Sequence, residues 1–243
     1  MKKKLISEYN KETGTVFSVE YLKKLAQVRS KFQLIEVYQT KKFGKVLLID
    51  KCFMLTEKDY KYYHEGCIDI LRNKINKKTN ILIIGGGDFA LVKSLSRFDK
   101  ISSITLVEID AKVIDICKKF FPQFFKLQSK FKQKLNIVID DGYNWVKKNK
   151  TKFDISIIDC TDPNHIASKL YSYNFYKYIF QNTKKNGLII QQAGNPIIHT
   201  KNIIQPMCKK LEKVGFIKPQ LFSFPMPTYP LGTWSFIKSC KNN

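Results

Sequence analysis

Short continuous apolar runs, separated by helical patterns, constrain the fold of this chain more than any other feature. From residue 80 onward, apolar runs at 81–84, 103–107, 135–139, 155–158 and 188–190 alternate with helical patterns at about 89–98, 110–120, 142–149 and 171–183. Continuous apolar strands between helices are typical of a parallel sheet that helices cover on both faces. The pattern therefore predicts an α/β fold with a doubly wound, mostly parallel sheet.

The segments on either side of this region have other patterns. Two strands are expected at 32–38 and 45–49, joined by a turn, which predicts a small N-terminal β-rich domain over residues 1–57. A helix is expected from about Asp59 to Asn73, and residues 58–243 would form the second domain. Near the C-terminus, strand-like runs at 220–224 and 233–238 predict an antiparallel hairpin at one edge of the sheet.

The charge of the chain does not point to a nucleic-acid partner. The formal net charge is +23, from 43 basic and 20 acidic side chains, but the arginines are only Arg29, Arg72 and Arg97. Phosphate recognition favours the guanidinium group, and the lysines are spread over every segment. Six widely spaced cysteines without a C-x-x-C pair indicate a reduced, cytoplasmic protein. We expect neither a signal peptide nor a membrane span.

Acidic residues follow four of the predicted strands. Ligands of doubly wound sheets bind beyond the carboxyl ends of the strands, so these side chains should meet in one crevice. Each acid alone could also be a helix cap or a turn residue. Their shared position, in a chain so rich in lysine, favours a site for positively charged ligands. The acids are Asp88 after the first strand, Glu108 and Asp110 after the second, Asp140 and Asp141 after the third, and Asp159 and Asp162 after the fourth.

A glycine turn after the first strand indicates a nucleoside ligand. Gly85-x-Gly87-x-x-Ala90 is typical of a nucleotide-binding turn, and Glu108 is at a suitable distance to hold a ribose. Asp88 stands where a dinucleotide places its pyrophosphate, and a carboxylate there repels phosphate. An adenosine ligand with a positive charge fits better. Asp141 would then accept a hydrogen bond from the adenine amine, or would simply form the turn into the next helix.

Such a ligand is a sulfonium nucleoside, and two chemistries remain open for it. S-adenosylmethionine, the donor of a methyltransferase, carries a carboxylate that Asp88 would repel. Its decarboxylated form keeps the amine and lacks the carboxylate, so Asp88 could pair with it. Asp88 is therefore a candidate selectivity residue.

Several motifs, in order along nearly the whole chain, resemble the spermidine synthase family, the polyamine aminopropyltransferases. The resemblance implies a small β-domain followed by a Rossmann-like catalytic domain of the class I methyltransferase type, in a homodimer. It implies aminopropyl transfer from decarboxylated S-adenosylmethionine, a co-substrate, to putrescine, giving spermidine and methylthioadenosine without a cofactor. The motifs are Phe32-Gln33, Phe43 to Leu47, Thr56 to Asp59, Tyr63-His64-Glu65, Gly85 to Asp88, Val107 to Asp110, Asp140 to Gly142, Asp159 to Pro163 and Pro227 to Gly232.

The resemblance also implies a role for each matching residue. Asp159 would be the proton acceptor, because a diamine nitrogen, with a pKa of about 10.4, must lose its proton before it attacks carbon. No metal is expected, since a sulfonium is already a good leaving group. The implied contacts are Gln33, Glu108, Asp141 and Gly142 to the methylthioadenosine part, Asp88 to the aminopropyl amine, and Tyr63, His64, Asp88, Asp159, Asp162, Gln192 and Tyr229 to the polyamine.

Three departures from the family pattern bear on activity. Phe89 replaces a glycine that usually follows the aspartate, which would put a bulky ring beside the nucleoside. Residues 164–169 replace a loop that usually contains Gly-Pro-Ala, and the sequence stops soon after Phe236, where relatives commonly continue. His165 and His199 are expected at the surface or in turns. Two alternatives therefore stay open. One is a methyltransferase, and the other is a catalytically weakened protein that binds a nucleoside or a polyamine, or a basic RNA-binding protein.

Overall fold

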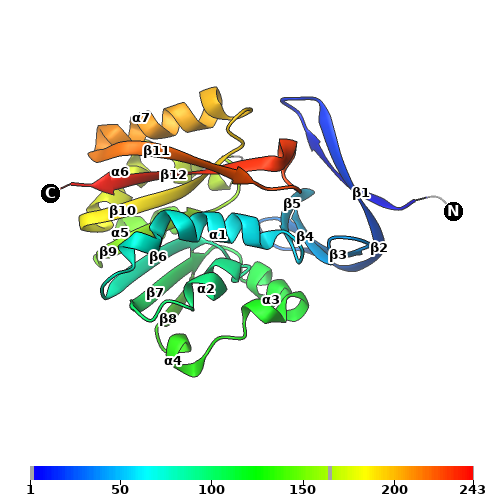
Figure 1. Ribbon diagram of the computed structural model, residues 1–243, viewed down its shortest axis with the longest axis horizontal. Helices are drawn as coiled ribbons and strands as arrows, with labels where there is room; N and C mark the ends of the chain where they lie inside the picture. Colours follow the sequence, from blue (N-terminus) through cyan, green and yellow to red (C-terminus); the bar gives the residue numbers. More distant parts are fainter. Residues whose placement is uncertain (1–2, 164–165, 243) are drawn as a thin grey trace.

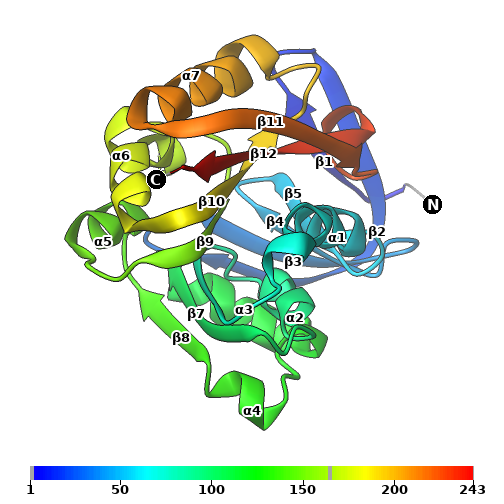
Figure 2. The same ribbon diagram turned by 60° about the vertical axis from the view of Figure 1, so that its left-hand side comes forward.

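The computed structural model describes residues 3–163 and 166–242, so the expectations for Asn164 and His165 lie outside the described residues. Figures 1 and 2 show that the described chain forms two sheets, a smaller one from its first part and a larger one covered by helices. The predicted α/β, Rossmann-like class and the N-terminal β-rich part are both confirmed.

The N-terminal sheet is an antiparallel meander in which each strand pairs with the next. The expected strands at 32–38 and 45–49 are present as β3 and β4, and β1, β2 and β5 accompany them. Ile6, Val19 and Phe53 form a small core on one face of this sheet, and the β1–β2 hairpin projects to one side (Figure 1). The strands are β1 (Leu5–Asn10), β2 (Thr15–Arg29), β3 (Leu34–Thr40), β4 (Lys45–Ile49) and β5 (Cys52–Thr56).

The larger sheet has the strand order β11-β12-β10-β9-β6-β7-β8 in the described residues. From β10 to β8 all neighbours are parallel, and β12 is antiparallel to both β10 and β11. The predicted parallel core and the antiparallel hairpin at one edge are therefore confirmed. The strands are β6 (Thr79–Gly85), β7 (Ile101–Glu108), β8 (Leu135–Ile139), β9 (Phe153–Asp159), β10 (Thr183–Gly194), β11 (Phe216–Pro225) and β12 (Thr233–Lys241).

Helices cover both faces of this sheet, as Figure 2 shows. Side chains of α1, α2 and α3 join the core on one face, and those of α5, α6 and α7 join the core on the other. The helices are α1 (Tyr60–Leu71), α2 (Ala90–Leu95), α3 (Ala111–Phe120), α4 (Ser129–Lys132), α5 (Gly142–Lys148), α6 (Tyr173–Asn182) and α7 (Gln205–Val214). Among the described residues, no helix is both long and apolar enough to span a membrane.

The topology sets the position of a ligand site between β6 and β9. The chain runs from β6 through β7 to β8 on one side and then returns to β9 on the other side of β6. Ligands of doubly wound sheets bind at such a reversal, beyond the strand ends. Gly85 is paired with Asp159 at these ends, and the backbone N–H of Gly86 donates to the Asp159 carbonyl at 3.0 Å.

Candidate active site

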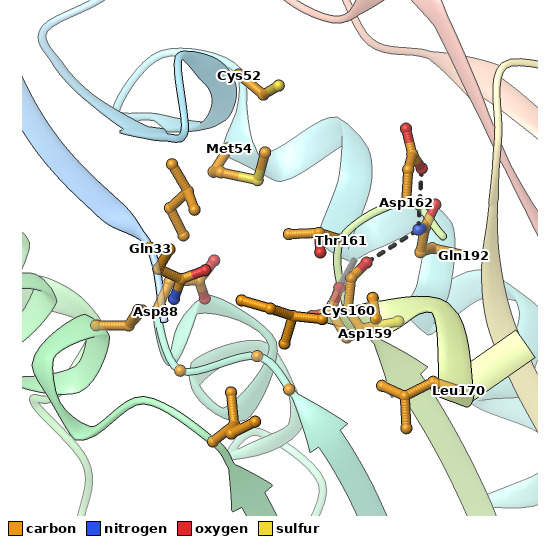
Figure 3. A pocket seen from close by; sticks show the side chains of 18 of the residues that line it. Gln33, Cys52, Met54, Asp88, Asp159, Cys160, Thr161, Asp162, Leu170 and Gln192 are labelled. Carbon is orange, nitrogen blue, oxygen red and sulfur yellow. Dashed lines mark hydrogen bonds between the residues drawn. The ribbon is translucent and has the colours of Figure 1, made fainter. Parts of the chain in front are cut away.

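A cavity of about 430 Å³ opens at the reversal point of the large sheet, and both sheets contribute to its wall. Every site residue expected from the sequence lines it. Figure 3 shows Asp88, Asp159 and Asp162 spread around this space. The expected residues are Gln33 beside β3, Tyr63 and His64 of α1, Asp88 after β6, Glu108 of β7, Asp141 and Gly142 at the start of α5, Asp159 and Asp162 at the end of β9 and beyond, Gln192 of β10, and Tyr229 before β12.

The turn after β6 requires glycine because its backbone lies very close to β7 and β9. Gly85 has a φ of +86°, and a Cβ there would lie 2.1 Å from the Asp159 carbonyl oxygen. A Cβ at Gly87 would lie 2.7 Å from Oε2 of Glu108. That carboxylate instead accepts from the Gly87 N–H at 3.1 Å and the Asp110 N–H at 3.0 Å. Burial raises the pKa of Glu108 to about 7.

Phe89 does not extend into the cavity where a nucleoside was expected, so its ring does not narrow that space. Its backbone is left-handed, with a φ of 67°, and the side chain turns away from the cavity into the core. There the ring stacks on Phe125 with the ring centroids 4.3 Å apart. Phe89 is absent from the described residues that line the cavity. The burial of the ring offsets a backbone strain of roughly 1–2 kcal/mol.

We expect Phe89→Gly to destabilise the protein even though it relieves this strain. Removing a buried phenylalanine side chain costs about 3–5 kcal/mol, which exceeds the strain. The melting temperature should fall by roughly 5–10 °C, while substrate binding is retained because the ring is outside the cavity. Thermal unfolding followed by circular dichroism measures this. Phe125→Ala, which leaves the backbone at Phe89 unchanged, is the control, and an unchanged or higher melting temperature for Phe89→Gly would contradict the account.

One half of the cavity is formed by the turn after β6 and the ends of β7 and β8. Asp88 accepts from the Ala90 N–H at 2.7 Å, and burial raises its pKa to about 6. Gln33 donates from Nε2 to Asp110 at 3.0 Å, which orients its amide. Asp141 caps α5 by accepting from the Asn144 N–H at 2.8 Å. Asp141 therefore forms the turn that the sequence allowed and also lines the cavity.

The other half of the cavity centres on Asp159. Tyr63 donates its hydroxyl to Oδ1 of Asp159 at 2.5 Å. Burial, together with the nearby Asp88 carboxylate, raises the pKa of Asp159 to about 6. His64 donates from Nδ1 to the Tyr60 carbonyl at 2.7 Å, and burial lowers its pKa. Because Nδ1 carries the proton, Nε2 of His64 is left as an acceptor.

Asp162 and Tyr229 complete this half of the cavity. Gln192 donates from Nε2 to Oδ1 of Asp162 at 3.2 Å and to the Cys160 carbonyl at 2.9 Å, contacts that Figure 3 marks. Burial raises the pKa of Asp162. The Tyr229 hydroxyl donates to the Met54 carbonyl at 2.7 Å, so it connects the β11–β12 loop to the N-terminal sheet.

The lining residues that were not expected from the sequence include Glu8, Cys52, Met54 and Trp234. Glu8 of β1 accepts from the Phe53 N–H at 2.7 Å, and burial raises its pKa to about 7. The only signal for Glu8 is its spacing of two from Ile6, which places both side chains on one face of a strand.

His199 lies in the bend that follows β10, one of the two settings expected for it, and it is buried, with 6% of its surface exposed. Its ring packs edge-on against Trp234, with the centroids 6.0 Å apart.

The strand-end acids form a site suited to positively charged ligands. Five of the seven line the cavity, and Asp110 and Asp140 are absent from its described lining. Within the described residues, no cluster of three His, Cys, Asp or Glu side chains is placed to hold a metal ion. Buried carboxylates facing an open cavity attract ammonium and sulfonium groups, which neutralise them.

Comparison with known families identifies this arrangement. The model of the spermine/spermidine synthase domain matches residues 60–243. The chain belongs to the spermine/spermidine synthase family. The model of the spermidine synthase tetramerisation domain matches residues 5–57, so both parts of this family's architecture are present.

Individual members of the family agree with this assignment. The chain is 36% identical over 236 residues to a polyamine aminopropyltransferase of Methanocaldococcus jannaschii, covering 97% of this chain and 79% of that protein. It is 39% identical over 232 residues to a polyamine aminopropyltransferase of Prochlorococcus marinus strain AS9601, covering 95% of this chain and 80% of that protein. This spermidine synthase family member is therefore an aminopropyltransferase.

Solved structures of the family have the same fold. A spermidine synthase in complex with the transition-state analogue AdoDATO superposes with a TM-score of 0.91 at 26% identity, over 100% of this chain and 82% of that one. Spermidine synthase from Thermotoga maritima superposes with a TM-score of 0.88 at 25% identity, over 100% of this chain and 80% of that one. The expected family and fold are thus confirmed.

Proposed function

We propose that this enzyme transfers the aminopropyl group of decarboxylated S-adenosylmethionine to putrescine, giving spermidine and methylthioadenosine. The observation that carries the proposal is the pair of half-buried carboxylates on Asp88 and Asp159, both lining one cavity at the reversal point of the sheet. Two cationic substrates need such a pair, one carboxylate for each ammonium group.

The donor would occupy the half of the cavity near β6, β7 and α5. Glu108 would accept from the ribose hydroxyls, with Gln33 beside it, and Asp141 with Gly142 would contact the adenine. Asp88 would pair with the ammonium of the aminopropyl group. S-adenosylmethionine carries a carboxylate next to that ammonium, and two carboxylates at one buried point repel each other. Asp88 therefore favours the aminopropyl donor over the methyl donor.

The acceptor would lie between Asp159 and Asp162, with Tyr63, His64, Gln192 and Tyr229 around it. Asp159 takes the proton from the attacking ammonium, and the nitrogen then attacks the aminopropyl carbon next to sulfur. The new C–N bond forms as the C–S bond breaks, and the electron pair of that bond stays on sulfur to give neutral methylthioadenosine. The raised pKa of Asp159 brings the carboxylate closer to the pKa of the amine, which favours the transfer. The reaction needs no resident cofactor.

A product assay separates this function from its alternatives. The purified protein is incubated with putrescine and either sulfonium donor, and the products are separated by chromatography. Methylthioadenosine and spermidine should form with the decarboxylated donor only. S-adenosylhomocysteine would indicate a methyltransferase, and binding without either product would indicate the catalytically weakened protein.

The pH dependence follows from the two carboxylates with pKa values of about 6. Below that pH both groups gain a proton, so Asp88 loses its charge and Asp159 can no longer accept a proton. The acceptor stays fully protonated from pH 5 to 7, because amine pKa values lie near 10. We expect kcat/KM to fall by about a hundredfold from pH 7 to pH 5. Steady-state rates across this range measure it, and a flat profile would contradict it.

We also propose that residues 1–57 and 58–243 act as an N-terminal and a catalytic domain in a cytoplasmic homodimer. Leu5, Tyr9, Val16 and Leu22 are exposed apolar residues of the projecting β1–β2 hairpin, and they suit burial against a second copy. All six cysteines in the described residues are free thiols, which suits a reducing compartment. Sedimentation analysis of the full chain would test the stoichiometry.

A further inference from the structure

The loop between β11 and β12 forms one wall of the acceptor half of the cavity. Tyr229, Pro230 and Trp234 from this stretch all line the cavity. The loop is closed by its own backbone bonds, from the Met226 N–H to the Gly232 carbonyl at 2.9 Å and from the Gly232 N–H to the Tyr229 carbonyl at 2.9 Å. What holds this closed loop against the rest of the molecule therefore determines where Tyr229 lies.

Two side chains of the loop contact the start of α1 and the N-terminal sheet. Thr228 donates its hydroxyl to the buried Asp59 at 2.6 Å, and Tyr229 donates to the Met54 carbonyl at 2.7 Å. Figure 1 shows the β11–β12 turn close to β5. These contacts hold only one side of the loop.

On the opposite side, the buried side chain of Asn195 contacts the loop. Asn195 follows directly after β10 and is fully buried. Its Nδ2 donates to the Pro230 carbonyl at 2.7 Å and to the Thr233 carbonyl at 3.2 Å. The two carbonyls flank the end of the loop, so one amide group spans the segment that leads into Trp234.

Asn195 is itself held rigidly by three further bonds. Its Oδ1 accepts from the Ile197 N–H at 2.8 Å and the Ile198 N–H at 3.0 Å. Its own backbone N–H donates to Nδ1 of His199 at 2.9 Å. A side chain at residue 194 would clash with the His199 ring, because a Cβ there would lie 2.2 Å from Nδ1 of His199. Glycine at this position therefore allows the contact. Each polar group of the Asn195 side chain is therefore used, which fixes its direction.

We propose that Asn195 is a positioning residue for the acceptor subsite, which acts by fastening the β11–β12 loop so that Tyr229 and Trp234 shape the polyamine channel. This inference rests on the proposed function and extends it to a residue outside the cavity. The donor subsite, formed by Gln33, Glu108 and Asp141, comes from other parts of the fold, so we expect it not to depend on Asn195.

Asn195→Asp tests the proposal because it removes the two bonds to the loop while keeping the shape of the side chain. A carboxylate of the same shape keeps the two acceptor contacts to Ile197 and Ile198, but it cannot donate to the Pro230 and Thr233 carbonyls. We expect the KM for putrescine to rise about tenfold while the KM for the donor stays unchanged. Asn195→Ser, which is too short to reach both carbonyls, should give the same split if the Asp variant folds poorly.

Asn182→Asp is the matched control. Asn182 is also buried and also donates from Nδ2 to a carbonyl, that of Val146, at 2.8 Å, but it is absent from the described lining of the cavity. It should lose stability as Asn195→Asp does, without the change in the KM for putrescine. Equal effects of the two substitutions on both KM values, or no effect of Asn195→Asp and Asn195→Ser, would overturn the proposal.

A measurement without substrate keeps this test independent of the proposed function. The chain has two tryptophans, so Trp145→Phe leaves Trp234 as the sole reporter. Trp234 packs against Tyr229 with the ring centroids 4.8 Å apart and donates from Nε1 to Gln192 at 3.1 Å. Adding Asn195→Asp should shift its emission to the red, as water reaches the indole. An unchanged spectrum would overturn the fastening role even if the wild-type enzyme had a different substrate.

Discussion

Replacing Asp159 by Asn should lower kcat for aminopropyl transfer by about a thousandfold, because the amide cannot accept the proton of the attacking amine. The amide keeps the shape of the carboxylate and can still accept from the Tyr63 hydroxyl, so the fold and the donor affinity should persist. Initial rates of methylthioadenosine formation measure the loss, and circular dichroism checks the fold.

The control for this substitution is Asp140→Asn. Asp140 also follows a strand of the parallel sheet, but it is absent from the described residues that line the cavity. It should leave the rate unchanged. If Asp159→Asn retained a tenth or more of the wild-type rate, the activation free energy would have risen by about 1.4 kcal/mol or less. Asp159 would then not be the base.

Replacing Asp88 by Asn should lower kcat/KM for the decarboxylated donor by roughly two to three orders of magnitude. The substitution leaves the ammonium of the aminopropyl group without its partner in a buried site, and such a loss costs about 3–5 kcal/mol. It also removes the repulsion toward the carboxylate of S-adenosylmethionine. The variant should therefore be inhibited more strongly by S-adenosylmethionine than the wild type is.

Inhibition constants for the two sulfonium compounds, measured side by side, decide this prediction. Asp115→Asn is a suitable control, because Asp115 lies on the exposed side of α3 and interacts with Lys112 at the surface. Unchanged selectivity in Asp88→Asn would show that another group excludes the carboxylated donor.

The sequence predicts the central part of this fold well because burial on two faces leaves a strong pattern. β6, β7 and β9 are buried at most of their positions and are rich in Ile, Leu and Val. The acids at or after their ends lie where ligands of parallel sheets bind. The long strand β2 has no such pattern. It is largely exposed and its pairing with β3 shifts register at two points, so its apolar residues do not alternate regularly. The helix α7 was also missed.

The individual side chains of the site were predictable to different degrees. Asp88 and Asp159 follow from their place after strands, whereas Glu8 reaches the cavity only through pairing of the N-terminal strands. The direction of the Phe89 ring could not be predicted, because residue type alone does not reveal a left-handed backbone, which turns the ring into the core. His199 is buried in part by Trp234, which is distant in sequence, and a local pattern does not contain such a contact.

The strand order at the β11–β12 edge has a consequence for biosynthesis. β12 lies between β10 and β11, although it is made after both. A nascent chain that has emerged only as far as residue 232 already holds the carboxylates of the cavity, but β11 has nothing to pair with and Trp234 is still missing. Until β12 has been synthesised, the backbone N–H and C=O groups along one edge of β10 are unpaired. They can then be bound by chaperones or by neighbouring chains. The acceptor half of the cavity is therefore complete only once β12 is in place.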